Sequence, residues 1–491
     1  QEFMTASKRP DLEESYAVFK KLEESGAFSD YDMKRITAMS NFLAGDQKLG
    51  AFPYFKNYTD ALSAARVSPD TSLFSQWHTT LERAFFALPK GKVKPIAAFL
   101  EFSADFMEHR ALHVGEIGNA TWRIQNGSFA FVLDNDAPKL ECKGVDLVGS
   151  RKRDSIVVWK TNGTYFPYEG KWKGKGGTIN WAGTGLDSTV YAELTSYRME
   201  SVKTLLNCDT ANLVYPLYFG NKRVAGSIEH NIYVDNKGNA PFPRFESFDK
   251  NITITRIGDG IEYVGGFRLA GNSFYGYGTN NRPAQLTINN NRNQRVFYGT
   301  SQLFVVKRGQ NVVAEDVTAN LFMGEDTLYH PDVNFRVDMN TDKPEIGGII
   351  HLTRGTKGTE KNPFYSTYYK MNLSTDKVAW FLNKDSLEIG SRLNTAKGVE
   401  LTAAFESNEY YSRREYDKMQ MIADKNPIST LYILYLERGQ DTISDNDFAQ
   451  VINSKFDYSS IQSLLAQMAA DGFINYNFDR HQMIVRPKLK H

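Results

Sequence analysis

Between residues 251 and 354 the chain contains the segments Ile252-Thr253-Ile254-Thr255, Gln285-Leu286-Thr287-Ile288-Asn289 and Asn334-Phe335-Arg336-Val337-Asp338. Apolar and polar residues alternate in each segment, which is typical of a β-strand that buries one face. Turn-forming residues such as Gly258-Asp259-Gly260 lie between them, because glycine and aspartate tolerate the backbone angles of tight turns. This stretch therefore predicts short strands joined by tight turns, and its polar positions form no catalytic grouping.

The same pattern extends in both directions, so we assign residues 115–400 to one β-rich domain. Further candidate strands are Phe129–Leu133, Ser155–Lys160, Thr178–Trp181, Thr189–Leu194 and Leu213–Phe219. A long run of short strands suits a sandwich, a barrel or a β-solenoid. Because the region is long for one sandwich and its turns are rich in glycine and asparagine, we favour a solenoid of stacked coils, with a sandwich as the alternative.

Residues 1–114 are predicted to form a helical domain. Apolar side chains recur there at helical spacing, first at Leu12, Tyr16, Phe19 and Leu22, and later at Phe74, Trp77, Leu81 and Phe85. Ser29-Asp30 is a candidate N-terminal cap. Several short amphipathic helices in succession indicate a bundle or an array of helical hairpins, whose usual role is packing or binding.

Residues 401–491 are predicted to return to helices, which makes the whole chain a multidomain α+β protein. Pro427 suits the first turn of one helix, Ser444-Asp445-Asn446-Asp447 suits the cap of a second, and Tyr458–Ala470 has the spacing of a third. Phe473–Asn477 and Met483–Arg486 then indicate a hairpin.

Three helices followed by a two-stranded wing, over residues 431–488, resemble a winged-helix domain. Such domains often bind DNA through the third helix, and DNA binding needs cations that neutralise phosphates. The third helix has no lysine or arginine between Asp457 and Asp471. We therefore expect this domain to pack against protein, and a nucleic-acid-binding winged helix is kept as an alternative.

The totals exclude several classes of protein. Lysine and arginine (58) nearly balance aspartate and glutamate (57), which argues against a strongly basic nucleic-acid binder. No apolar run is long enough for a transmembrane helix. Cys142 and Cys208 lack CxxC spacing, so a cysteine zinc site is excluded, while free thiols and a long-range disulfide both stay open.

Two features indicate an exported protein. The chain starts at Gln1, which fits cleavage of a signal peptide, although residues 1–3 could instead be a remnant before a native Met4. The pattern Asp-(Ser/Thr)-(Ala/Thr/aliphatic) also resembles the O-glycosylation acceptor of exported Bacteroidota proteins, at Asp154, Asp187, Asp209, Asp326, Asp385 and Asp441. We expect an extracytoplasmic glycoprotein in the periplasm, at the outer membrane or on the cell surface, whose natural chain could continue beyond His491.

A further resemblance concerns the strands around residues 260–338. The segments 302–309 (QLFVVKRG) and 312–316 (VVAED) resemble coils of the lipopolysaccharide-transport (OstA-like) β-solenoids. This resemblance implies an open, stacked sheet that can carry acyl chains. The helical start, asparagine-rich strands and helical tail together resemble large envelope or secreted proteins of Bacteroidota.

One stretch is a candidate ligand-binding surface. The run from Gly170 to Thr178 is rich in glycine and lysine but lacks the spacing of a phosphate-binding loop. With the aromatic residues nearby it could bind an acidic glycan, and the candidate residues are Trp159, Tyr165, Trp172, Lys173, Lys175 and Trp181. Strand packing around a glycine turn is the competing interpretation.

Signals for catalysis or metal binding are weak. His109 and His113 have the i,i+4 spacing of a zinc pair, but Arg110 stands where the HExxH motif requires glutamate. No Gly-x-Ser-x-Gly motif is present, and acidic pairs such as Asp134/Asp136 do not identify a sugar cleft. We predict no catalytic residues, no metal and no cofactor.

These observations favour a non-enzymatic cell-envelope or secreted scaffold with protein partners in a larger assembly. A glycan or lipid is a further candidate ligand, whereas nucleic acid and a transmembrane span are not expected. The alternative function is a carbohydrate-active lyase or hydrolase on a β-helix.

Overall fold

The computed structural model describes residues 9–89, 91–115, 119–152, 154–182, 185–232, 241–307, 309–339, 348–355, 358–384, 386–390, 403–409, 412–419, 425–478 and 480–490. The chain divides into two compact units. The first contains residues 1–248 and 269–272, and the second contains residues 249–268 and 273–491. Their boundary falls inside the region 115–400 that the sequence assigns to one β-rich domain.

The first unit begins with the predicted helical region. Its helices are α2 (Pro10–Glu24), α3 (Asp30–Asn41), α4 (Lys56–Val67), α5 (Leu73–Phe86) and α6 (Val93–His109). Ser29 caps α3 as predicted, because its hydroxyl accepts the Asp32 N–H and the Asp32 carboxylate accepts the Ser29 N–H. Trp77, Phe85 and Phe99 are among the fully buried side chains of the core.

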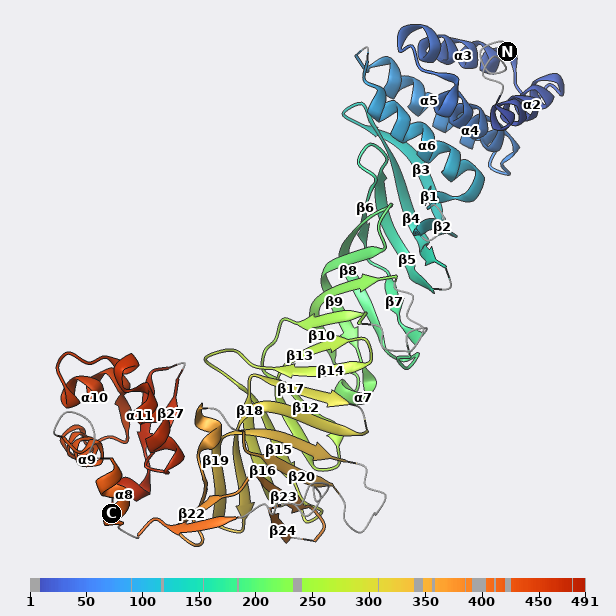
Figure 1. Ribbon diagram of the computed structural model, residues 1–491. Coiled ribbons are helices and arrows are strands. Elements are labelled where there is room, and N and C mark those ends of the chain that lie inside the picture. The colour runs from blue at the N-terminus through green and yellow to red at the C-terminus, as the bar shows by residue number, and fades with distance from the viewer. Residues whose placement is uncertain are drawn as a thin grey trace. The chain divides into compact units, whose positions relative to one another are not determined.

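The strands of the first unit follow these helices along the chain (Figure 1). They are β1 (Ala111–His113), β2 (Thr121–Gln125), β3 (Ser128–Asp134), β4 (Ala137–Arg151), β5 (Asp154–Phe166), β6 (Lys171–Lys175), β7 (Thr178–Asn180), β8 (Tyr191–Glu200), β9 (Leu205–Val214), β10 (Arg223–Asn231) and β11 (Arg244–Ser247). Consecutive strands from β3 to β6 and from β7 to β11 pair antiparallel.

Bulges divide the long strands into two halves that pair with different neighbours. The first half of β4 pairs with β3 and the second half pairs with β2. The register between β4 and β5 shifts on both sides of Val145, next to Gly144, whose φ is +60°. A bulge adds a residue to one strand and bends it, so the long strands turn where their partners change.

Glycines on these strands accommodate aromatic rings. A Cβ atom at Gly163 would lie 2.2 Å from the Trp172 ring, and one at Gly174 would lie 2.1 Å from the Tyr197 ring. Trp172 and Tyr197 are both buried. Close packing of a ring on strand backbone therefore explains Gly174, whereas Gly170, Gly176 and Gly177 of the same run have positive φ, which glycine tolerates.

One predicted strand is wrong in its second half. The segment Leu213–Phe219 was expected to be extended, but β9 ends at Val214 and a short helix, α7 (Pro216–Phe219), follows. Pro216 is the physical reason, because proline has no N–H for a ladder hydrogen bond and its φ suits the first turn of a helix.

The second unit contains most of the remaining strands, although the last two residues of β13, Leu269 and Ala270, belong to the first unit. They are β12 (Ile252–Gly258), β13 (Ile261–Ala270), β14 (Ser273–Tyr277), β15 (Ala284–Asn289), β16 (Arg295–Ser301), β17 (Leu303–Lys307), β18 (Asn311–Met323), β19 (Asp326–Asp338), β20 (Ile349–Thr353), β21 (Phe364–Ser366), β22 (Met371–Ser374), β23 (Lys377–Phe381), β24 (Ser386–Ile389) and β25 (Ala404–Ser407). β18 pairs with both β17 and β16, and β19 pairs with both β20 and β21. The large antiparallel sheet confirms the β-rich middle of the chain.

The last part of the second unit contains α8 (Arg413–Lys418), α9 (Pro427–Arg438), β26 (Thr442–Ser444), α10 (Asp445–Ile452), α11 (Tyr458–Ala470), β27 (Ile474–Asn477) and β28 (Gln482–Val485). The three helices from α9 to α11 and the hairpin lie where the sequence predicts them. Two strands were missed: β26, which pairs with β28, and β25, which pairs with β22 although it lies in the segment expected to be helical.

Two general expectations can be compared with the structure. Among the described residues, no helix combines the length and the apolar character needed to cross a bilayer. Cys142 and Cys208 are both buried and both carry free thiols, so the two cysteines do not pair.

Candidate functional site

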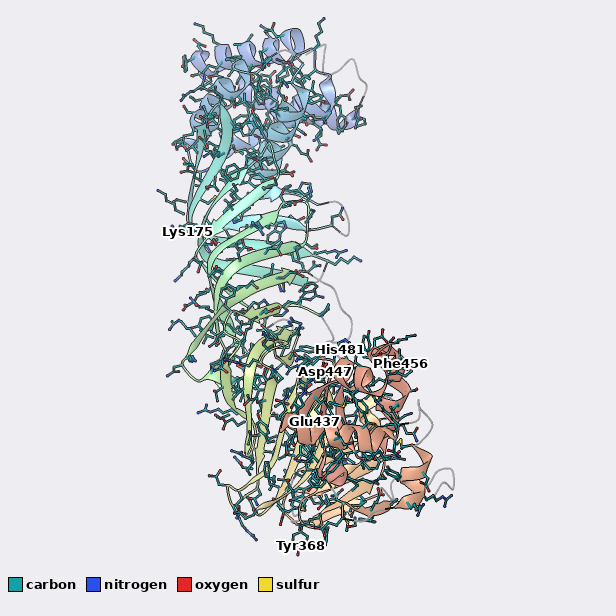
Figure 2. All side chains as sticks on the ribbon, turned by 90° about the vertical axis from the view of Figure 1, so that its left-hand side faces the viewer. Lys175, Tyr368, Glu437, Asp447, Phe456 and His481 are labelled. Carbon is teal, nitrogen blue, oxygen red and sulfur yellow. The ribbon has the colours of Figure 1, made fainter. Side chains whose placement is uncertain are left out.

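The six candidate ligand-binding residues do not share one surface. Tyr165, Trp172 and Trp181 are buried, with 3%, 0% and 2% of their surface exposed. Trp159 is half-buried, whereas Lys173 and Lys175 are exposed on β6, and Lys175 lies at the outer surface in Figure 2.

Strand geometry explains this separation, because successive side chains of a strand point to opposite faces. On β6 the buried Trp172 alternates with exposed lysines. The three buried rings pack in the interior of the unit and offer no stacking platform for a glycan.

The His109–His113 pair also comes apart. α6 ends at His109, and Arg110 adopts a left-handed conformation with φ of 53°. His113 lies on β1, so the two imidazoles do not share a helical face as a zinc pair would require. Two residues spaced i,i+4 share one face only when both lie on the same helix, and α6 ends before it reaches His113.

Sequence reasoning missed a cluster of three carboxylates in the second unit. Asp316 lies at the bulge of β18, Asp332 lies on β19, and Glu360 lies on a 3-10 turn at Gly358–Lys361. One carboxylate oxygen from each lies within 4.8 Å of the other two. Carboxylate oxygens suit Ca²⁺ or Mg²⁺, but acidic groups often gather near a surface without an ion, and we assign none here.

A buried histidine holds the backbone beside this cluster. His330 is fully buried, its Nδ1 accepts the Asp332 N–H at 3.0 Å, and its Nε2 donates to the Asn362 carbonyl at 2.6 Å. Burial lowers the pKa of His330 to about 3, because the charged ring would lose its hydration. His330 is therefore neutral at physiological pH and connects β19 to the segment after Glu360 without acting as an acid.

Arg486 is the most deeply buried arginine described in the second unit, with 3% of its surface exposed. Its Nη1 donates to the Pro363 carbonyl at 3.3 Å and to Asn475 Oδ1 at 3.4 Å. Its Nη2 donates to Asn372 Oδ1 at 3.3 Å, and its guanidinium carbon lies 5.1 Å from the Tyr365 ring centroid. Burial lowers the pKa of Arg486 to about 10, and the group remains charged at neutral pH.

Further polar contacts join the same two parts of the second unit. The Asn362 amide donates to Asn475 Oδ1 at 3.2 Å, and the Asn475 amide donates to the Tyr329 hydroxyl at 3.4 Å. Lys488, which follows β28, forms an ion pair with Glu406 on β25 at 2.7 Å. We call Tyr329, Asn362, Asn372, Asn475 and Arg486 the C-terminal polar interface, because these residues join residues 427–490 to the strands β19–β25.

Helices α11 and α9 of the C-terminal domain differ in what they face. α11 contacts the 3-10 turn at Gly358–Lys361, so part of this helix faces the sheet. On α9 the apolar side chains Tyr432, Ile433 and Leu436 are 37%, 54% and 59% exposed. Neighbouring Glu437 and Asp447 mark this part of the protein in Figure 2.

Comparisons with known proteins give no family for this chain. No family model matches it, and neither a curated protein nor a solved structure matches it.

Proposed function

We propose that this protein is a non-enzymatic scaffold or binding protein of the cell envelope, or a secreted one, and a component of a larger assembly. The observation that carries the proposal is an apolar face on a firmly docked domain. Tyr432, Ile433 and Leu436 are exposed together on α9, while the C-terminal polar interface holds the same domain to the sheet. Exposed apolar groups that lie together favour contact with another protein.

The C-terminal domain supports the protein-binding role through its composition. The order α9, β26, α10, α11, β27, β28 is the order of a winged helix with its wing between β27 and β28, and we propose that fold for residues 427–490. α11 carries no lysine or arginine and contacts the turn at Gly358–Lys361. A DNA-binding form would need cations on this helix, so retention on a DNA column at low salt would contradict the proposal.

The strands support a scaffold. We propose that they form an OstA-like solenoid whose repeating unit is a long bulged strand, such as β4 or β18, with two short partners. One face of these strands buries large side chains, including Trp172 and Phe335. Such packing favours a structural role for the strands of each unit in an extracytoplasmic assembly.

The proposal is tested by substitution on α9 in the full-length protein in its native cells. Ile433→Asp combined with Leu436→Asp should abolish co-purification of the partner from native membranes, as measured by quantitative mass spectrometry. Val202→Asp is the matched control, because Val202 is 58% exposed in the first unit. Equal recovery of all co-purifying proteins from the α9 variant and the control would contradict the binding role, and free protein in the cytosol would contradict the location.

A carbohydrate-active enzyme is the second candidate, favoured by the cluster of Asp316, Asp332 and Glu360. Glycosidases place two carboxyl groups about 5–10 Å apart across the scissile bond, and the facing oxygens of this cluster, within 4.8 Å of one another, lie just below that range. Turnover of a polysaccharide that is lost in Asp332→Asn but kept in Asp134→Asn would establish this activity in place of the scaffold role.

A further inference from the structure

A pocket in the first unit lies where α6, β2 and β3 meet. Its volume is about 460 Å³, and its lining includes His109, Arg110, Arg123, Gln125 and Phe129. This volume is in the range of small-molecule sites, roughly 300–1,000 Å³. The lining contains two arginines and no aspartate or glutamate.

The guanidinium of Arg110 is fixed in position at the pocket. Its central carbon lies 4.9 Å from the Phe129 ring centroid and 5.4 Å from the Phe106 ring centroid, so two aromatic faces hold the cation. Nη2 donates to the Ser68 hydroxyl at 3.3 Å. Nη1 is buried and has no hydrogen-bond partner among the described residues. A buried charged donor without an acceptor is costly, and an oxyanion in the pocket reaches Nη1 only after a small shift of the Arg110 side chain, because less than 1 Å² of this atom is accessible.

Arg123 brings a second cation to the pocket from the neighbouring strand. β2 places Trp122 and Ile124 in the core, so the alternating Arg123 and Gln125 share the opposite face. Within the described part of the chain, Arg123 forms no ion pair. Three carboxylates near the pocket have other contacts. Asp70, whose charge acts on Arg110, accepts the Ser72 N–H and hydroxyl at 3.0 and 2.7 Å. A Glu108 carboxylate oxygen lies 3.6 Å from His109 Nε2, and Asp146 accepts the Asn126 amide at 2.6 Å.

We propose that this pocket binds an oxyanion, a phosphate or a carboxylate group, carried by a sugar-sized molecule. Arg110 and Arg123 bind the oxyanion, because the planar guanidinium matches the geometry of both groups. Gln125 and the Phe129 ring contact the rest of the ligand, since an amide can bind hydroxyls and a ring can pack on the apolar face of a sugar. This proposal concerns the first unit and does not depend on the scaffold role of α9.

The test is calorimetric titration of the full chain with four probes at constant ionic strength: inorganic phosphate, glucose 6-phosphate, glucuronate and uncharged glucose. We expect saturable binding of glucose 6-phosphate or glucuronate, and the stronger of the two identifies the phosphate or the carboxylate source. Glucose should bind at least tenfold more weakly. Equal binding of glucose, or no saturable binding of any anionic probe, would overturn the proposal.

Variants identify the site. Arg123→Gln should weaken binding by about 10- to 100-fold, the usual effect of losing hydrogen bonds to a charged group. Arg110→Lys keeps the charge but loses the paired donors, and should weaken binding by about tenfold. Arg256→Gln is the control, because Arg256 is an exposed strand arginine outside the pocket. Unchanged circular dichroism and thermal midpoint check folding, and an equal loss in Arg123→Gln and Arg256→Gln would exclude this pocket.

Discussion

Replacing Arg486 by alanine should loosen the C-terminal domain from the sheet. The substitution removes the donors for the Pro363 carbonyl and Asn372 Oδ1, while Asn475 Oδ1 still accepts from Asn362. Each acceptor that becomes buried without a partner costs about 1–3 kcal/mol, which gives about 2–6 kcal/mol in total. Removing the buried charge also removes its desolvation penalty, so we expect about 3 kcal/mol of local destabilisation.

Hydrogen exchange measured by mass spectrometry resolves this effect. A loss of about 3 kcal/mol raises exchange on the order of a hundredfold if these amides exchange through local opening. The increase should occur in peptides that contain β21, β22 and β27 and should be absent from α2–α6.

Lys490→Ala is the matched control for this experiment. Lys490 forms a 2.7 Å ion pair with Asp441 inside the C-terminal domain, and both groups are partly exposed. Its loss should cost less than about 1 kcal/mol. The reasoning about the C-terminal polar interface would be refuted if Arg486→Ala and Lys490→Ala increased exchange equally around Pro363.

Three further predictions concern single features of the fold. Because burial lowers the pKa of His330 to about 3, only the unfolded state takes up a proton as the pH falls below about 6.5, so stability is full above pH 7 and drops by about 2 kcal/mol at pH 5. Urea unfolding at both pH values, in wild type and His330→Asn, measures this difference. Gly174→Ala should destabilise the first unit by about 1–3 kcal/mol in urea, because the new methyl group overlaps the Tyr197 ring. Ser29→Ala should lower stability by about 1 kcal/mol through loss of the α3 cap, measured by thermal unfolding.

Each of these predictions has its own contrary result. An unchanged pH dependence in His330→Asn would show that another group controls acid stability. Gly45→Ala is the control for Gly174, because no atom lies within 4 Å of a Cβ built there, and equal effects would exclude the ring overlap. A Ser29→Ala variant as stable as wild type would show that the cap contributes little.

The parts of the fold that the sequence predicts well depend on neighbouring residues. The third C-terminal helix was expected at Tyr458–Ala470, which is the extent of α11, and Asp457 caps it. Helical spacing, caps and turn residues act over a few positions, so they can be read without knowing the tertiary structure. The end of β9 before Pro216 is also a local signal, and it was overlooked because the flanking residues are apolar and aromatic.

The candidate sites depend on distant residues and could not be found in this way. Trp172 has the residue type of a ligand platform, and only strand alternation and its contact with Gly163 place it in the core. The carboxylates of Asp316, Asp332 and Glu360 meet through a bulge and a turn that no motif indicates. The pocket at Arg110 needs the left-handed end of α6 and the pairing of β1 with β2.

By itself, the sequence determined the order of helical and β-rich regions, the positions of the three C-terminal helices α9–α11 and of some strands, and the lack of cations on the third C-terminal helix. Tertiary structure alone decided which side chains are buried and which meet. Arg486 lies 114 residues from Asn372 and 123 from Pro363, yet it donates to both. Periodicity indicates which face of an element is buried, but not which distant element covers that face. The functional surfaces of this protein depend on which distant elements pack together.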